Sequence, residues 1–323
     1  MTARQHHYVS QCYLKGFATR RRKPKLFVID AKNRTSFTTS PSNVGVERDF
    51  HRIDADGLQP DALENALAGF ESELAPALER IISARSIKND DDRALLLNLI
   101  GLLHIKNPAM RESIRQFHEQ ISKVMMSMAV ATPERWASQV RQMKRDGYLP
   151  EDADTDYEKM RDFIERDQYK INLYTGRHLQ LELETFDKIL PYIFGRKWML
   201  LKAPKGTTGF ITSDHPVCLM WSDPKMRAGN HPVGLGLRRT QILFPISNEL
   251  ALMGAFEAEN MEGDVPEHMV AQINGSILLH AKRQIYARES DFVYQLKHHR
   301  RMMRGNELLK DERTLPSRTR SKN

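Results

Sequence analysis

The order of helical and strand-like segments along the chain is the feature that most restricts its fold. Between residues 61 and 196 the chain contains successive helical patterns, and in the first of them, residues 61–86, apolar residues recur at spacings of three and four. Segments typical of strands precede this region, as in KLFVIDAK and TSFTT, and follow it, from KWMLLKAP to RQIYAR. This order indicates an α+β fold. We expect a mixed or antiparallel sheet built from N-terminal and C-terminal strands, with a large helical middle segment.

The same order predicts how the chain divides into domains. We expect one α+β domain over residues 1–290, with a helical insertion at about residues 61–196. The stretch SDFVYQLKHHRRMM predicts a C-terminal helix that begins at Ser290. Residues 291–323 are then a basic helix followed by a tail, and the composition of its last residues, SRTRSKN, is typical of disorder.

Composition excludes several classes of protein. No apolar run approaches the roughly 18–20 residues that a membrane-spanning helix needs. The two cysteines, Cys12 and Cys218, lie far apart without a CxxC pattern, which excludes a disulfide scaffold or a Cys-based zinc site as the organising principle. The N-terminus lacks the apolar region of a signal peptide. We therefore expect a cytoplasmic location and no association with a membrane.

Basic residues are concentrated at the two ends of the chain. The formal net charge is +8, yet the first 25 residues contain seven Lys and Arg and no acid, and residues 297–323 contain nine Lys and Arg against three acids. Such ends can attract a polyanion such as nucleic acid, with affinity that falls as salt rises. The alternative is that they are solvated termini that add solubility. The candidate nucleic-acid contacts are Arg20, Arg21, Arg22, Lys23, Arg300, Arg301 and Arg304.

Familiar catalytic motifs are absent from the sequence. It contains no GxxxxGK[ST], no GxGxxG after a strand, no HExxH and no GxSxG. The reaction therefore has to be sought in smaller groups of polar residues, and two short stretches provide them.

The first stretch is the opening, HHYVSQCYLKGF. Ser10 is a suitable N-cap for a short helix, so His6 and His7 lie on an extended lead-in. Side chains of neighbours on an extended segment point to opposite faces, and only one of the two histidines is expected to enter a given pocket. Histidine suits proton transfer near neutral pH or metal binding. The alternative is that one His is hydrogen-bonded in the core and the other lies at the surface.

The second stretch is GFITSDHPVCL, in which an apolar strand delivers Asp214 at its end. An Asp in this place can hold a metal, orient a histidine or act as a base. The alternative is a turn in which Asp214 only accepts hydrogen bonds from backbone N–H groups. In the helix at residues 61–86, Glu64 and Glu71 share a face beside the Leu67 and Leu74 stripe, and either is a candidate accessory carboxylate.

These stretches resemble a known family. HHYVSQCYLKGF is similar to the opening HHYVPQFYLRNF of the mainly bacterial domain-of-unknown-function family forty-two thirty-eight, and GFITSDHPV is similar to its fiTSDnPv strand. The resemblance spans roughly residues 5–290. Ser10 stands where the family usually has Pro, and His215 where Asn is common. The resemblance implies that the opening and the late strand end meet in space, which would place His6 or His7 near Asp214.

Two hypotheses of function follow. The leading one is a cytoplasmic, metal-assisted phosphodiester hydrolase, nuclease-like, in a mobile-element or phage-defence context. His6 or His7 would be the general base or a metal ligand, Asp214 a metal ligand or an orienting carboxylate, and Glu71 or Glu64 an accessory carboxylate. The cofactor would be a divalent metal and the partner a nucleic acid. The competing hypothesis is a non-catalytic module that binds nucleic acid or protein, in which the His and Asp motifs are structural.

Overall fold

The computed structural model describes residues 5–19, 22–52, 59, 61–167, 169–171, 175–223, 225–226, 232–312 and 314–315. It divides the chain into two compact units. The first consists of Met1–Asn107 and Leu179–Asn323, and the second of Pro108–His178. Only the middle of the expected insertion, residues 108–178, is therefore a unit of its own.

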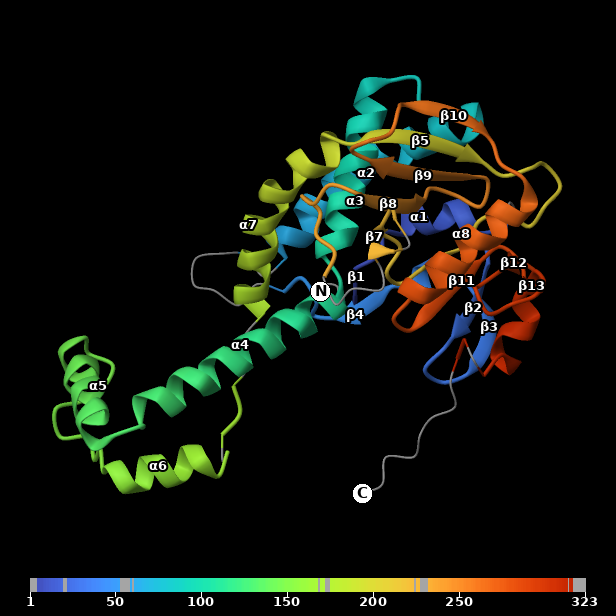
Figure 1. Cartoon of the computed structure of the whole chain (residues 1–323). Coiled ribbons are helices and arrows are strands. Elements are labelled where there is room, and N and C mark those ends of the chain that lie inside the picture. Colours follow the sequence, from blue (N-terminus) through green and yellow to red (C-terminus); the bar gives the residue numbers. More distant parts are fainter. Residues whose placement is uncertain are drawn as a thin grey trace. The chain divides into compact units, whose positions relative to one another are not determined.

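The described elements agree with the predicted order in outline, with strands before and after a helical middle (Figure 1). The helices are α1 (Gln11–Leu14), α2 (Ala62–Ala84), α3 (Asp90–Ile105), α4 (Pro108–Ala129), α5 (Pro133–Arg145), α6 (Tyr157–Glu165), α7 (Thr175–Phe194) and α8 (Glu267–His280), with 3-10 helices η1 (Lys15–Phe17), η2 (Pro41–Asn43) and η4 (Gly305–Lys310). The strands are β1 (Gln5–His7), β2 (Leu26–Asp30), β3 (Thr35–Thr39), β4 (Val46–Arg48), β5 (Lys197–Lys202), β6 (Thr212–Ser213), β7 (Cys218–Trp221), β8 (Thr240–Pro245), β9 (Leu250–Ala255), β10 (Met261–Asp264), β11 (Gln284–Ala287), β12 (Val293–Tyr294) and β13 (Met303–Arg304).

The first unit contains two larger sheets. The five-stranded sheet has the order β10-β5-β9-β8-β7, in which only the β10–β5 pair is parallel. The four-stranded sheet has the order β3-β2-β11-β6 and is antiparallel throughout. This second sheet joins N-terminal to C-terminal strands, as the α+β interpretation predicts. The fold class is confirmed, but the strands form separate sheets rather than one.

Both faces of the five-stranded sheet are covered. Alternate residues of β8 and β9, such as Phe244 and Leu252, pack with α2 and α3, while Leu243 and Ala251 belong to the core around α8. This division follows from the two-residue period of a strand. Strands covered on both faces are apolar almost throughout, which explains the sequence TQILFPI.

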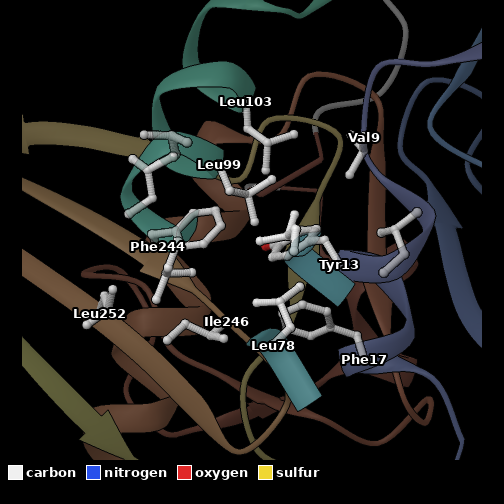
Figure 2. Packing of buried hydrophobic residues seen from close by; sticks show 14 of the residues in the cluster. Val9, Tyr13, Phe17, Leu78, Leu99, Leu103, Phe244, Ile246 and Leu252 are labelled. Carbon is white, nitrogen blue, oxygen red and sulfur yellow. The ribbon is translucent and has the colours of Figure 1, made fainter. Parts of the chain in front are cut away.

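The opening of the chain is part of this core. Tyr13 and Phe17 are fully buried beside Leu78, Leu99 and Phe244 (Figure 2). The Tyr13 hydroxyl donates to the carbonyl oxygen of Pro245 at 2.8 Å and lies 2.7 Å from Oγ1 of Thr212. A buried hydroxyl needs such partners. The N-terminal segment is thus fixed between α2 and the sheet, and it holds the residues that follow in a defined position.

The second unit has its own small core. Val130 of the α4–α5 turn, Trp136 and Val140 of α5, and Ile164 of α6 are buried together, and Met126 of α4 packs against them. Thr132 caps α5, since its Oγ1 accepts the N–H of Arg135, and Pro133 occupies the first turn. Among the described residues, no helix of either unit is long and apolar enough to cross a membrane.

The expected C-terminal helix from Ser290 is wrong. This segment forms the β12–β13 pair and then η4. Phe292, Val293 and Tyr294 are consecutive and all buried, and the N–H of Gln295 donates to the carbonyl oxygen of Ala271 in α8. Tertiary contacts with α8 therefore stabilise an extended conformation here over the helix that the local pattern favours.

Candidate functional site

Strand β1 presents the two histidines differently. β1 pairs with β4 in an antiparallel register that places His6 opposite Glu47 and His7 opposite Val46. His6 is 4% exposed, whereas His7 is half-buried. The alternation of side chains on a strand explains the difference. Only one histidine of the pair points fully into the protein, as the sequence predicts.

His6 contacts a residue that the sequence analysis did not select, His51. The backbone N–H of His51 donates to Nδ1 of His6 at 2.7 Å, and the two imidazole rings stack with centroids 5.3 Å apart and planes 9° from parallel. Because Nδ1 of His6 accepts a hydrogen bond, the neutral ring has its proton on Nε2.

His51 is in turn bound to Glu64, in the first turn of α2. Nδ1 of His51 lies 2.6 Å from Oε2 of Glu64, and the His51 side chain is fully buried. A carboxylate at this nitrogen favours the tautomer with the proton on Nδ1, so the lone pair of the neutral ring is on Nε2. The pKa of Glu64 is below its ordinary value, first because of the hydrogen bond from His51 and then because of the charges of His51, His6 and Lys106.

Together these three residues form a group of metal-ligating side chains. Each of His6, His51 and Glu64 offers one possible metal-ligand atom, and these three atoms lie within 4.8 Å of one another. They come from β1, from the segment after β4 and from α2, so the fold brings together residues from separate parts of the sequence. Two histidines and a glutamate are a ligand set found in catalytic zinc sites, where a water takes the fourth position.

Other residues of the opening surround this group. Nζ of Lys106, at the end of α3, donates to the carbonyl oxygen of His7 at 3.1 Å. Burial lowers the pKa of His7, although the negative charges of Glu71 and Glu64 act to raise it. The Ser10 hydroxyl donates to Oε1 of Glu71 at 2.6 Å rather than capping α1. Glu71 therefore contacts the opening through Ser10, and it is not a member of the metal-ligating group.

Asp214 does not join the histidines. Its Oδ1 accepts the N–H of Lys282 at 2.9 Å, and its Oδ2 accepts the N–H of Arg283 at 2.8 Å. Burial raises the pKa of Asp214, while these backbone hydrogen bonds oppose the rise. Within the described part of the chain, neither group of converging metal-ligating residues includes it. Asp214 thus fixes the turn between α8 and β11, which is the structural alternative that the sequence left open.

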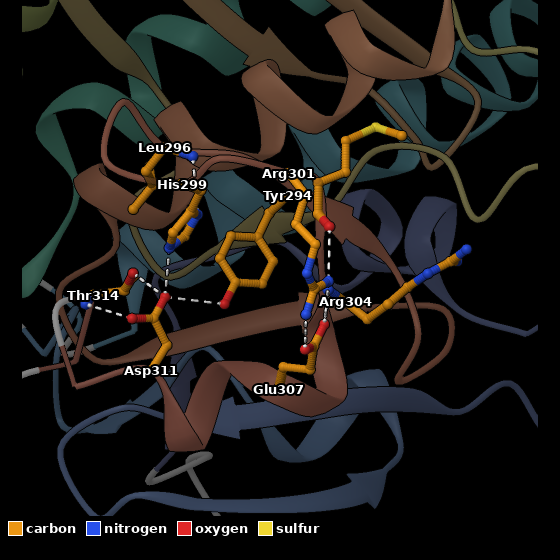
Figure 3. A network of polar contacts seen from close by, with 9 residues as sticks. Tyr294, Leu296, His299, Arg301, Arg304, Glu307, Asp311 and Thr314 are labelled. Carbon is orange, nitrogen blue, oxygen red and sulfur yellow. Dashed lines mark hydrogen bonds and ion pairs between the residues drawn. The ribbon is translucent and has the colours of Figure 1, made fainter.

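The second converging group is His298, His299 and Asp311. Nε2 of His299 lies 2.8 Å from Oδ2 of Asp311, and Nδ1 of His299 accepts the N–H of Leu296 (Figure 3). The Tyr294 hydroxyl and Thr314 also donate to Asp311. Both ring nitrogens of His299 are thus used within the protein, and the network holds the C-terminal segment together.

The basic residues at the two ends have different surroundings. Arg22 and Lys23 are exposed, while Arg20 and Arg21 lie outside the described residues. Arg300 is exposed as well. Arg301 forms an ion pair with Glu307 at 2.6 Å (Figure 3). Arg304 donates to the carbonyl oxygen of Asp291 at 3.3 Å. The candidate contacts in the C-terminal segment are therefore spread over β13 and the loop before it rather than aligned on one helix.

The sequence gives no local signal for His51, the residue that it missed. His51 occurs in DFHRID, an irregular connector without periodicity, 13 residues before Glu64. Only the pairing of β1 with β4 brings this connector back beside His6, and neither strand shows a strand pattern of its own. Lys106 was missed for a related reason, since a lysine at the end of an apolar helix looks like a solvated residue.

Comparison with protein families shows which family the chain belongs to. The model of DUF4238, described as a protein of unknown function, matches residues 5–291. The chain belongs to this family. The match confirms the resemblance of the HHYVSQCYLKGF opening and the TSDHP motif, and it includes the whole His6–His51–Glu64 group. No curated protein and no solved structure gives a significant match to the chain.

Proposed function

We propose that this DUF4238 chain is a cytoplasmic, metal-assisted hydrolase that acts on a phosphodiester. The observation that supports a metal-assisted reaction most strongly is the convergence of His6, His51 and Glu64 within 4.8 Å. In a tetrahedral zinc site with bonds of roughly 2.0–2.2 Å, neighbouring ligand atoms are on the order of 3.3 Å apart. To hold the ion, Nδ1 of His51 and Oε2 of Glu64, which are 2.6 Å apart, would have to separate slightly, and any distance near the 4.8 Å limit would have to shorten.

Metal binding would change the proton positions in this group. The ion would replace the proton between Nδ1 of His51 and Oε2 of Glu64, which lie 2.6 Å apart. His6 could bind the ion through Nδ1 only by giving up the hydrogen bond from the His51 N–H. Binding through Nε2 would require its proton to move to Nδ1, which breaks the same hydrogen bond. We therefore expect His6 to be the weakest of the three ligands. Metal uptake should release protons and become tighter as the pH rises.

The surrounding residues suit hydrolysis of an anionic substrate. A bound divalent ion would lower the pKa of its water and polarise the phosphoryl oxygen. His7 is held neutral by burial, so it can accept a proton at neutral pH. The ammonium group of Lys106, 3.1 Å from the His7 carbonyl oxygen, would stabilise negative charge that develops on the phosphate. The net charge of +8 and the exposed Arg22, Lys23 and Arg300 favour a polyanion such as nucleic acid.

The test is cleavage of single- and double-stranded DNA and RNA by the full chain with Mg²⁺, Mn²⁺ or Zn²⁺. We expect cleavage by the wild type and its loss in His51→Ala and Glu64→Gln. The matched control is Glu71→Gln, which alters a carboxylate on the same helix outside the group and should retain cleavage. No cleavage by the wild type with any of the metals would contradict the proposal.

A non-catalytic module that binds nucleic acid or protein is the second candidate. The hydrogen bonds of Asp214 with Lys282 and Arg283, and of Ser10 with Glu71, favour it, because they tie these motifs to the fold. Reversal of the exposed charges of Lys297 and Arg300 to Glu separates the candidates. For a nucleic-acid module it should weaken a salt-dependent affinity for DNA or RNA, while for a hydrolase it should leave the turnover of a small phosphodiester unchanged.

A further inference from the structure

A polar cavity of about 560 Å³ lies at the opposite end of α2 from the metal-ligating group. Its walls include Arg85, which follows α2, the loop at residues 203–209, Asn248 and Glu249 between β8 and β9, and Arg288. Glu64 lies in the first turn of the same helix. At 1.5 Å per residue, the two ends of α2 are separated by about 30 Å. The cavity is therefore a separate place from the candidate active site.

Asn248 is held firmly in the wall of this cavity. Its N–H donates to the carbonyl oxygen of Gly16 at 3.1 Å, and its own carbonyl oxygen accepts the N–H of Phe210 at 2.7 Å. Gly209 has a φ of +72°, and a Cβ added there would lie 1.9 Å from the carbonyl oxygen of Asn248. Glycine alone permits this close approach. The backbone of Asn248 is thus clamped from both sides.

Two buried oxygen atoms in the wall have no hydrogen-bond partner. They are Oδ1 of Asn248, a residue that is 3% exposed, and Oγ1 of Thr208. Both residues line the cavity. A buried polar atom left without a partner destabilises the folded chain, so such atoms in the wall of a cavity favour a ligand that completes them. Oδ1 of Asn248 can only accept, and the Thr208 hydroxyl can accept or donate, so both suit an N–H or O–H group of a ligand.

Charged side chains of both signs line the same cavity. The cations are Arg85, Lys205 and Arg288, and the acids are Glu249, Glu289 and Asp291. Arg85 is paired with Glu249 at 3.0 Å, whereas Lys205 lies exposed on the loop. Guanidinium and ammonium groups recognise carboxylate or phosphate. Among the described residues that line the cavity none is aromatic, so it offers no stacking surface for a nucleobase.

We propose that this cavity binds a small, non-aromatic anionic molecule. Its anionic group contacts Lys205 and Arg288, and its N–H or O–H groups donate to Asn248 and Thr208. The volume suits a small molecule. Sugar phosphates and free amino acids share this chemistry, and the experiment distinguishes them. The inference does not depend on the proposed hydrolase activity.

The test is a panel of sugar phosphates and the proteinogenic amino acids, each at up to ~10 mM, added to the full chain in thermal unfolding and calorimetric titration. We expect one of the two classes to raise the Tm and to bind with a single site, and the class that binds identifies the anionic group. If neither class binds, the proposal is overturned.

Three variants locate the binding. Asn248→Leu removes the acceptor at similar volume, and Lys205→Glu reverses an exposed charge that no core packing depends on. Each should weaken binding at least about tenfold, the loss expected for a hydrogen bond or ion pair with a charged group. Lys310→Glu, an exposed residue outside the cavity, should leave binding unchanged. Equal affinity in the wild type and in folded Lys205→Glu and Asn248→Leu would show that the ligand binds elsewhere, and would overturn the assignment.

Discussion

Nδ1 of the fully buried His51 lies 2.6 Å from Oε2 of Glu64, within the group that also includes His6. This contact fixes the tautomer of His51 and lowers the pKa of Glu64. A carboxylate and an imidazole in this arrangement can exchange the proton between them for a metal ion. The predictions below separate that role from a purely structural one.

Glu64 should make stability depend on pH in the acid range. Its pKa is lower in the folded chain than the ordinary value of 4.5, so the unfolded chain takes up the proton first. The contribution to the free energy of unfolding is therefore present above pH ~4.5 and is lost as the pH falls through the folded pKa. Urea unfolding at several pH values should show a difference between the wild type and Glu64→Gln that shrinks on acidification. A constant difference would contradict this account of the His51 contact.

His104 should destabilise the folded chain below neutral pH. Burial lowers its pKa from 6.5 to about 4, and its Nδ1 has no hydrogen-bond partner. The folded chain thus resists protonation that the unfolded chain accepts. Stability should fall as the pH drops from 6.5 towards 4, by about 3 kcal/mol for this residue.

Chemical denaturation of the wild type and His104→Gln between these pH values measures that effect. The variant should show a smaller loss of stability on acidification. An equally steep loss in the variant would mean that other groups, such as His215, account for the pH dependence.

Asp214 should prove structural. Asp214→Ala leaves the N–H groups of Lys282 and Arg283 without their acceptors, so we expect a loss of about 2–4 kcal/mol in the free energy of unfolding. Metal binding by the variant, measured while it is still folded, should match the wild type. If the variant had normal stability but no longer bound metal, Asp214 would be a metal ligand, and the structural assignment would be wrong.

Gly209→Ala should destabilise the chain severely. The added Cβ would lie 1.9 Å from the carbonyl oxygen of Asn248, at a φ of +72° that side chains rarely adopt. We expect a loss of more than about 3 kcal/mol, seen as a fall in Tm. Gly206→Ala is a matched control, because its φ is +82° but nothing lies within 4 Å of an added Cβ. Gly206→Ala measures the cost of the positive φ alone, without a steric clash. Equal losses of Tm in the two variants would contradict the close approach of Gly209 to Asn248.

The helices of this fold were predictable because their signals are local. Asn89 caps α3 and Thr132 caps α5, and both residue types are common at helix N-termini. The β1–β4 pair and β10 were not predicted, since QHH, VER and MEGD are short and lack a strand pattern. Their pairing depends on residues distant in sequence. The C-terminal segment was assigned the wrong element for the same reason, because its contacts with α8 are not local.

The candidate site was predictable only in part. The motif at His6 and His7 indicated the right strand, and the helix pattern placed Glu64 beside the core. His51 was not identified, because a histidine in an irregular connector gives no signal until β4 returns it to β1. The TSDHP motif could not decide the role of Asp214, because an Asp at a strand end can bind backbone N–H groups as well as take part in catalysis.

The most direct test of the proposed metal centre is calorimetric titration of Zn²⁺ into the wild type, Glu64→Gln and Glu71→Gln. The two variants make the same change on the same helix, inside and outside the group. The account predicts one Zn²⁺ per wild-type chain, tighter as pH rises, retained in Glu71→Gln and weakened at least about tenfold in Glu64→Gln. Absence of Zn²⁺ binding in the wild type, or equal affinity in all three proteins, would contradict it.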